Sequence, residues 1–398
     1  MMRIFYLIVF SLFSAQYALN QSVIRIDPER TPNGTMKMSD LIESIEYIPL
    51  ETNKNCLIGD IKRNNFLKLS ENYILVDCTV SQSFYLFNRS GKFIAKIGGL
   101  GGGPGEYTRY SASIFSIDEK NKQIILAKSI GRENLCQLMY YDLNGKYIRS
   151  LSVDKSLSGI FHTQFYNKYV VMHINNPFKE GDPPFSYSFF SDDYTVIKQE
   201  IKNIDYTTTR PGEVSTLGYF YHYLYGGNLH VKSAFLNDTV YSIGKDLSFF
   251  PKYIIQSGKY SLTTQILSDP DLYNSLYKNR TFFWSVFETN NYLLISYLYK
   301  EKYFFQYYDK QKNISLLFDS ASGIPNDYDG GFDFWPKQQN ENEYITWYNA
   351  YLFEENTNKL NPKGPQNAIE NFKKITRDID LDENPVIVIV KFKGRIFE

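Results

Sequence analysis

The stretch FYLFNRSGKFIAKI (Phe84–Ile97) decides the fold, because a second copy of it follows as LMYYDLNGKYIRSL (Leu138–Leu151). A shift of 54 positions places Gly91 on Gly145. Each copy has two runs of alternating apolar residues on either side of an Asn/Asp-x-x-Gly turn, which is typical of a β-hairpin. A repeat of this period, built from strands and turns, predicts a propeller or a solenoid.

Weaker copies of the hairpin follow along the chain. An aromatic residue marks the same place in five copies, at steps of 54, 49, 51 and 67 residues: Phe87, Tyr141, Phe190, Tyr241 and Tyr308. Pro385–Lys393 (PVIVIVKFK) lies where a sixth marker belongs. Other strand-like runs lie between the hairpins, so each unit offers about four short strands, the content of one propeller blade. The sequence therefore predicts an all-β fold, a six-bladed β-propeller with four-stranded antiparallel blades.

The ends of the repeat region predict how the propeller closes. The sixth unit stops too early for a complete last strand, whereas Ser44–Leu50 (SIEYIPL) is a strand-like run left over near the N-terminus. We expect this run to complete the last blade and close the ring, which removes unpaired strand edges. Asp269–Asn279 and Pro365–Thr376 have helical patterns and are expected as insertions on blades. Residues 22–398 are thus predicted to form a single propeller domain.

The N-terminus has the pattern of a targeting segment. Arg3 supplies positive charge, Ile4–Phe13 is apolar, and small residues follow. The apolar run is too short to span a bilayer, which favours a secretory signal peptide over 1–21, with an uncleaved anchor as the alternative. No later segment is apolar enough to cross a membrane. The expected location is therefore extracytoplasmic, whether periplasmic, on the cell surface or secreted.

Charge and cysteine content narrow the classes of partner. Lys plus Arg and Asp plus Glu balance at 43 each, so no basic field for nucleic acid or an anionic membrane is expected. Cys56, Cys78 and Cys136 are an odd number without metal-type spacing. One pair could bridge in an oxidising compartment, and buried free thiols are the alternative.

The segment IGGLGGGPGEY (Ile97–Tyr107) resembles the GxGPGEY stretch of bacterial exported proteins of the six-bladed, NHL-like β-propeller family. Three further segments are similar to the same family: SDLIESIEYIPLET (Ser39–Thr52), NDTVYSI (Asn237–Ile243) and DENPVIVIVKFK (Asp382–Lys393). The resemblance implies a six-bladed propeller that is exported and often lipid-anchored, although this chain has no cysteine after its apolar run. Most members of that family have no established activity, so the resemblance implies a fold and little mechanism.

The Gly-rich loop itself does not match a phosphate-binding motif, because neither G-x-x-x-x-G-K-[S/T] nor G-x-G-x-x-G is completed. Its Pro-Gly-Glu sequence recurs two blade lengths later, which places both loops on one face of the predicted disc. Loops on a rigid scaffold commonly carry function. The candidate ligand-binding residues are therefore Glu106, Tyr107, Arg109, Arg210, Glu213 and Trp335. The alternative is that Glu and Arg pair or cap backbone groups, and that Trp335 packs between blades.

Metal and catalytic patterns are weak. Alternating carboxylates over Asp327–Asp333 could bind Ca²⁺, but they lack EF-hand spacing, and solvated turns are the alternative. No H-E-x-x-H or G-x-S-x-G motif is present. Of the four histidines, His173 and His230 are expected in strands, and His222 opposite a face of alternating tyrosines. We predict no catalytic residues and no metal site, and the sequence leaves any cofactor unknown.

The sequence thus predicts an exported β-propeller that acts as a binding or interaction module. The expected ligand is a glycan, a peptide or a partner protein of the envelope, held at the channel face. The alternative is a propeller enzyme of the lyase, lactonase or glycan-processing kind with a metal in the central channel. Convergence of three or more polar side chains on one point would favour the enzyme, and a broad aromatic or charged rim would favour the binding module.

Overall fold

A computed structural model describes most of the chain. The described residues are 22–59, 61, 67–78, 81–107, 114–130, 135–154, 160–166, 169–174, 187–190, 196–200, 220–233, 238–263, 266, 270–320, 323–356 and 360–396. The predicted signal peptide and the candidates Arg109, Arg210 and Glu213 lie outside them. The chain divides into a first unit (Met1–Gly34 with Ile204–Asp319) and a second unit (Thr35–Asn203 with Ser320–Glu398).

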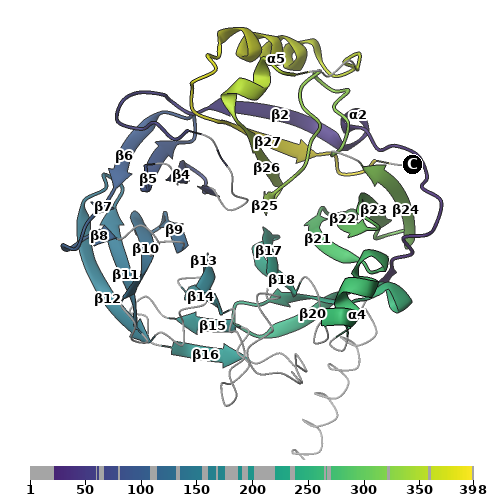
Figure 1. The fold of residues 1–398 in the computed structure, drawn as a ribbon, viewed down its shortest axis with the longest axis horizontal. Helices are drawn as coiled ribbons and strands as arrows, with labels where there is room; N and C mark the ends of the chain where they lie inside the picture. The colour runs from purple at the N-terminus through teal and green to yellow at the C-terminus, as the bar shows by residue number, and fades with distance from the viewer. Residues whose placement is uncertain are drawn as a thin grey trace, which may run out of the picture. The chain divides into compact units, whose positions relative to one another are not determined.

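The second unit contains three antiparallel sheets of four strands each and a fourth group of four antiparallel strands (Figure 1). The first is β3 (Leu67–Leu69), β4 (Tyr73–Cys78), β5 (Ser83–Asn88) and β6 (Phe93–Ile97). The second is β9 (Ile114–Asp118), β10 (Gln123–Ile130), β11 (Leu135–Asp142) and β12 (Tyr147–Asp154). The third is β13 (Ile160–Tyr166), β14 (Tyr169–Ile174), β15 (Tyr187–Phe190) and β16 (Val196–Glu200). In the fourth, β25 (Gln338–Asn340), β26 (Glu343–Tyr348), β27 (Val386–Phe392) and β2 (Ile42–Pro49) pair in that order.

The first unit contains two further antiparallel sheets. One is β17 (Phe220–Tyr225), β18 (Asn228–Ser233), β19 (Thr239–Ile243) and β20 (Phe249–Gln256). The other is β21 (Phe282–Glu288), β22 (Tyr292–Tyr299), β23 (Lys302–Asp309) and β24 (Ile314–Ser320). A short N-terminal strand, β1 (Ser22–Arg25), adds to β20 in parallel.

The sequence repeat corresponds to a repeated irregularity in the strands. The third and fourth strands of four sheets shift register at the same place, next to the aromatic markers: Leu86/Phe87, Tyr140/Tyr141, Phe189/Phe190 and Val240/Tyr241. Such a bulge bends the strand and increases its twist. The same residue pattern therefore produces the same local geometry in each of these sheets, which confirms the predicted hairpins.

The two strong copies of the hairpin also form the same turn. Asn88 Oδ1 accepts hydrogen bonds from the backbone N–H groups of Ser90 and Lys92, and Asp142 Oδ1 accepts the equivalent two in the second copy. Gly91 and Gly145 adopt φ of 82° and 80°. A Cβ at either glycine would collide with a backbone carbonyl oxygen of the preceding sheet. The glycines are thus required both by the turn and by the close approach of neighbouring sheets.

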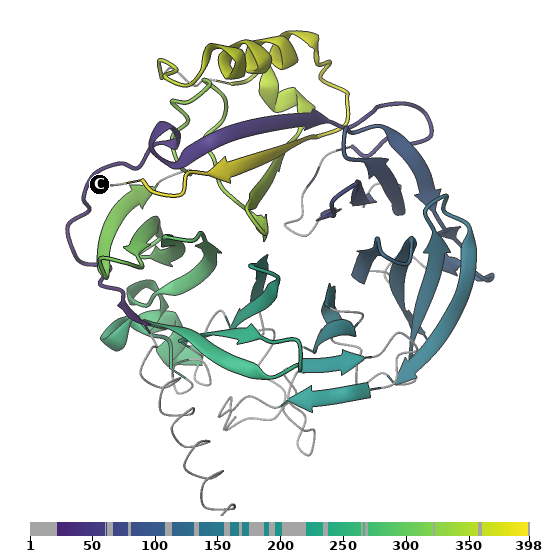
Figure 2. The same cartoon turned by 180° about the vertical axis from the view of Figure 1, so that it is seen from behind.

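The pairing predicted for Ser44–Leu50 is observed, because β2 runs antiparallel to β27 with Tyr47 opposite Val388. Both predicted helices are also present, as α4 (Pro270–Leu276) and α5 (Gln366–Asp378). Figures 1 and 2 show α5 lying over β2. Phe372 of α5 is buried and its ring lies 5.4 Å from that of Tyr47.

Short elements complete the described fold: α2 (Met38–Leu41), β7 (Gly99–Leu100), β8 (Glu106–Tyr107) and three single-turn 3₁₀ segments (Gly258–Tyr260, Tyr277–Asn279 and Ala350–Phe353).

Cores form where neighbouring sheets pack face to face within each unit. In the second unit, one cluster joins β26 and β27 to β4 and β5, and another joins β4–β6 to β9–β11. In the first unit, buried residues of β17–β20 pack against those of β21–β24. Cys56 and Cys78, both in the second unit, are buried free thiols. Among the described residues, no helix has the length and apolar character needed to cross a membrane.

Candidate functional site

The Gly-rich loop uses its polar groups to hold itself together. One carboxylate oxygen of Glu106 accepts a hydrogen bond of 2.8 Å from the backbone N–H of Gly103. Tyr107 is 2% exposed, and its hydroxyl donates to the Ile97 carbonyl oxygen at 3.0 Å. Tyr141 reaches the loop from β11 and donates to the Gly105 carbonyl oxygen. The side chain of Tyr107 therefore lies in the core, and the carboxylate of Glu106 caps backbone; ligand binding by either stays a prediction.

Trp335, the aromatic candidate, is half-buried. Its neighbour Phe332 stacks on Tyr348 at 4.4 Å and meets Phe353 edge-on at 4.9 Å. Phe332 therefore packs against other aromatic rings. A ligand contact by Trp335 remains a prediction.

The acidic segment Asp327–Asp333 is a buried hydrogen-bond network in the second unit. Asp327 accepts hydrogen bonds from the backbone N–H and the hydroxyl of Ser39. Asp329 accepts from the Tyr47 hydroxyl at 2.7 Å and from Asn326. Both carboxylates are 2% exposed, so they are not solvated, and Asp327 also forms an ion pair with Lys363 at 3.5 Å. Across the described residues, no group of three or more His, Cys, Asp or Glu side chains could hold a metal ion.

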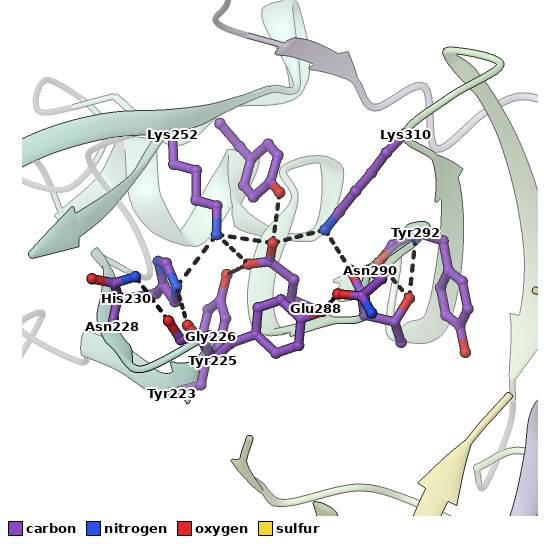
Figure 3. A network of polar contacts seen from close by, with 12 residues as sticks. Tyr223, Tyr225, Gly226, Asn228, His230, Lys252, Glu288, Asn290, Tyr292 and Lys310 are labelled. Carbon is purple, nitrogen blue, oxygen red and sulfur yellow. Dashed lines mark hydrogen bonds and ion pairs between the residues drawn. The ribbon is translucent and has the colours of Figure 1, made fainter. Parts of the chain in front are cut away.

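A different group of polar side chains gathers in the first unit, around Glu288 (Figure 3). We call it the Glu288 cluster and define it by six residues: Tyr223, His230, Lys252, Tyr253, Glu288 and Lys310. Four of them, Tyr223, His230, Tyr253 and Glu288, are buried. The lysine side chains are partly exposed, at 30% for Lys252 and 18% for Lys310.

Two sheets contribute to the Glu288 cluster. Glu288 is the last residue of β21, and Lys310 directly follows β23, where its backbone N–H donates to the Asn291 carbonyl oxygen. The other members come from the neighbouring sheet, on β17, β18 and β20. Glu288 thus extends from one sheet to donors on the other, and it bonds the two sheets together through charge as well as through apolar packing.

The carboxylate of Glu288 accepts hydrogen bonds on both oxygens. Tyr223 donates to Oε2 at 2.8 Å, and Tyr253 donates to Oε1 at 2.7 Å. Both ammonium groups approach Oε1, Lys310 at 2.7 Å and Lys252 at 2.9 Å. Burial alone would raise the pKa of Glu288, but the two ammonium groups outweigh it and lower the pKa to about 2.

The remaining members of the cluster are neutral at neutral pH. Burial, together with the charge of Lys252, lowers the pKa of His230 to about 4. Burial and the nearby Glu288 raise the pKa of both Tyr223 and Tyr253. Two ammonium groups therefore face one carboxylate, and the cluster carries one surplus positive charge.

The surplus charge has a measurable cost. Both ammonium nitrogens lie close to the same oxygen atom, at 2.7 Å and 2.9 Å. Two like charges about 5 Å apart repel by roughly 3 kcal/mol at an effective dielectric constant of about 20. Accordingly, burial and the charge of Lys252 lower the pKa of Lys310 even though Glu288 raises it. Lys310 also donates to the carbonyl oxygen of Thr289, which leaves one of its three N–H donors without an acceptor in the described contacts.

This arrangement is suited to holding an anion. Glu288 is ionised and fully hydrogen-bonded, and the Nε2 atom of neutral His230 lies 3.1 Å from the Tyr225 carbonyl oxygen. Neither is poised to exchange a proton near neutral pH, which general acid–base catalysis requires. By contrast, a partly exposed ammonium group with a spare donor can bind a carboxylate or a sulfate.

The sequence did not identify Glu288, Lys252 or Lys310. It placed His230 in a strand as a core or strand-face residue, and His230 is 1% exposed in β18. The one available signal was the alternation of tyrosines over Phe220–Tyr225, because buried tyrosine hydroxyls need hydrogen-bond partners. Tyr223 and Tyr225 do share a buried face, and Tyr223 brings its hydroxyl to Glu288.

Comparison with known proteins gives a family and a fold. Residues 21–391 match the model of a family described as a domain of unknown function (DUF4934). No curated protein matches the chain.

Among solved structures, a candidate exported protein of Bacteroides fragilis is similar with a TM-score of 0.67 at 14% identity, covering 94% of this chain and 99% of the other. A member of the DUF4221 family from Bacteroides vulgatus has a TM-score of 0.48 at 12% identity, covering 89% and 97%. The Dos1 propeller has a TM-score of 0.35 at 9% identity, covering 65% and 58%. At such identities the first of these similarities concerns the fold alone.

Proposed function

The chain belongs to the DUF4934 family, and from this premise we propose that it is an exported six-bladed β-propeller that binds an anionic ligand through the Glu288 cluster. The ligand would be a glycan, a peptide or an envelope protein that presents a carboxylate or sulfate group. This proposal moves the binding site from the Pro-Gly-Glu loops to the Glu288 cluster.

The repeat supports the propeller. The described strands include two groups of four antiparallel strands in the first unit and four such groups in the second, and four of these groups share a bulge at the aromatic marker. Pairing of β2 with β27 joins the two ends of the repeat region, which is how a propeller ring closes. Export is supported by the sequence pattern of residues 1–21.

One observation carries the binding function: the ammonium groups of Lys252 and Lys310 share a single carboxylate oxygen of Glu288. One lysine would already neutralise the charge of the carboxylate. The second lysine is held against electrostatic repulsion and partial burial, and an incoming anion would relieve both costs. Amide side chains lie nearby, since Tyr225 donates to Asn290 and Gln311 donates to Asn291, and such groups suit a polar ligand.

Titration calorimetry of the chain from residue 22 onward would test this proposal. The probes are sodium glucuronate, sodium sulfate and an acidic tetrapeptide, with neutral glucose as the reference. We expect at least one anion to bind, and Lys310→Met to weaken it about tenfold, equal to about 1.4 kcal/mol. Binding should also weaken with added salt, because the site attracts its ligand by charge.

A matched control is Lys278→Met, which removes one positive charge from an exposed pair with Glu301 in the same unit. This variant should bind the anion as the parent chain does. Equal loss of affinity in both variants would mean that net charge, and not the site, drives binding. Absence of binding by all three anions would refute the proposal.

A further inference from the structure

The N-terminal segment of the first unit lies on both of its sheets as an extended arm. We define the arm as residues 22–34. Its strand β1 pairs with the outer strand β20 in parallel, from Ser22 opposite Tyr253 to Arg25 opposite Gln256. Beyond the strand, Asn33 exchanges two hydrogen bonds with Leu317 of β24, the outer strand of the other sheet. The arm therefore covers the outer edges of two sheets, which would otherwise present unpaired backbone groups.

The arm is recognised by its side chains as well as by its backbone. Ile24 and Ile26 are 1% and 4% exposed within the core of the first unit. The carboxylate of Glu29 accepts hydrogen bonds from Tyr260 at 2.7 Å, Tyr299 at 2.9 Å and Lys300 at 3.1 Å. A strand followed by a turn, with an Ile-x-Ile-x-x-Glu pattern, thus meets two apolar sites and one site that selects an acidic residue. Addition of a strand to a sheet edge, with alternate side chains in pockets, is a common mode of peptide recognition.

The connection that follows the arm would allow the arm to bind to another copy of the chain. Its hydrogen bonds to other described parts of the chain all reach residues between Tyr253 and Leu317, more than 200 positions away. The arm ends at Gly34, where φ is +127°, and no atom lies within 4 Å of a Cβ built there. The next residue, Thr35, belongs to the second unit. Gly34 can therefore redirect the chain without a steric penalty.

We propose that the edge occupied by the arm is a docking site for the arm of a second copy of this chain, so that two chains can exchange arms. The same contacts form in either case, because the site recognises residues 22–33 and not their covalent connection. Exchange of an identical element is a low-cost route to a dimer. The occupant is a second copy because its arm carries the two isoleucines and the glutamate that this edge accepts.

Two single-cysteine variants test the exchange in the full chain from residue 22 onward. Val23→Cys on one chain and Ile254→Cys on a tagged chain occupy paired positions on β1 and β20, and Val23 is 43% exposed. Neither chain can form this disulfide within itself. After mixing at high concentration and oxidising, we expect a covalent heterodimer on a non-reducing gel. A peptide with the sequence of residues 22–34 should compete and reduce its yield.

The controls separate exchange from random collision. Lys278→Cys replaces Ile254→Cys as an exposed partner that does not pair with β1, since the Lys278 side chain is 53% exposed. The arm pair should yield about fivefold more heterodimer than this control, as expected for a specific dimer. The change Ile24→Asp in the chain that carries Val23→Cys should reduce the yield to the control level. Equal yields from Ile254→Cys and Lys278→Cys, or no effect of Ile24→Asp, would overturn the proposal.

Discussion

Asp329 and Glu288 are both buried carboxylates, yet their surroundings give them opposite character. Asp329 accepts hydrogen bonds from neutral groups, namely the Tyr47 hydroxyl, the Asn326 amide and the Gly331 N–H, and burial raises its pKa. Glu288 is approached by two ammonium groups, and its pKa falls to about 2. The comparison teaches that burial does not by itself decide the direction in which the pKa of a carboxylate shifts; the charge of its hydrogen-bond donors decides it.

If the proposed function is correct, this difference separates a structural carboxylate from one in a ligand site. Asp329 connects the segment before α5 to β2 and has donors for both oxygens within the protein. Glu288 instead compensates one of two ammonium charges and leaves the other available. A neutral network tends to hold a fold together, whereas a cluster with surplus charge can respond to a ligand.

Replacement of Glu288 should have the largest effect. In Glu288→Gln, the amide NH₂ would face donors, and two ammonium groups would remain close together without a counter-charge. We expect a loss of about 3 to 5 kcal/mol in the free energy of unfolding, as for other broken buried ion pairs. Urea unfolding followed by circular dichroism would measure it. A loss below that of Asp329→Asn would mean that the surplus charge has no structural cost.

Acid should remove the contribution of Glu288 next. Its pKa in the folded state is about 2, below the ordinary value of 4.5, so the stabilisation is present above pH 4.5 and is lost as the pH falls to about 2. The loss amounts to about 3 kcal/mol. Unfolding free energies of the parent chain and Glu288→Gln should therefore converge as the pH falls. Parallel curves from pH 6 to 3 would contradict the assigned charge of Glu288.

Protonation of His230 should cause a smaller loss of stability, in a higher pH range. Its pKa in the folded state is about 4, below the ordinary value of 6.5, so the unfolded chain binds the proton first. Stability should fall by about 2 kcal/mol between pH 7 and pH 5 on this account. His230→Gln, which keeps a donor towards the Tyr225 carbonyl oxygen, should lack this decrease. His222→Gln, on the half-buried face of β17, is the control that should retain it.

The smallest effect is expected at Asp329. In Asp329→Asn, the amide oxygen can still accept from Asn326 and Gly331, and the Tyr47 hydroxyl can accept from the amide NH₂. The cost at pH 3 should be about 1 kcal/mol or less. The raised pKa of Asp329 makes the parent chain lose stability as the pH rises. The difference in unfolding free energy between the parent and the variant should therefore be smaller at pH 7 than at pH 3. The opposite trend would place a compensating cation near Asp329.

Local patterns predicted the strands well. The hairpins at Phe84 and Leu138 form with the turn geometry that Asn88-x-x-Gly91 and Asp142-x-x-Gly145 favour, and the run Ser44–Leu50 pairs on the last strand. Period-2 alternation also placed Tyr223 and Tyr225 on one buried face. The hairpins and the alternation depend on residues within a few positions of one another, where sequence spacing and physical spacing agree. The pairing of β2 with β27 is a long-range contact, and it was inferred from the incomplete last repeat.

The candidate site was not predictable in the same way. Glu288 meets Tyr223 and Lys252 across 65 and 36 positions, so no local motif contains them. The Glu106 loop shows the opposite situation. Its carboxylate bonds to Gly103, only three positions away, so this sequence motif stabilises the local loop. The parallel pairing of β1 on β20 has no periodic signal either, since four residues are too few to show one.

The sequence by itself determined the repeating unit, its turns and its hairpins, because alternation and turn chemistry act over short distances. The count of repeats also predicted the pairing of the two ends, because it left one strand over at the N-terminus. Only the tertiary structure decided which of 43 acidic residues would become a buried anion between two lysines, and which edge the N-terminal arm would cover. The physical reason is that burial, charge and edge pairing depend on what lies nearby in space. Packing of one sheet on the next fixes those neighbours, and the order of residues along a strand does not.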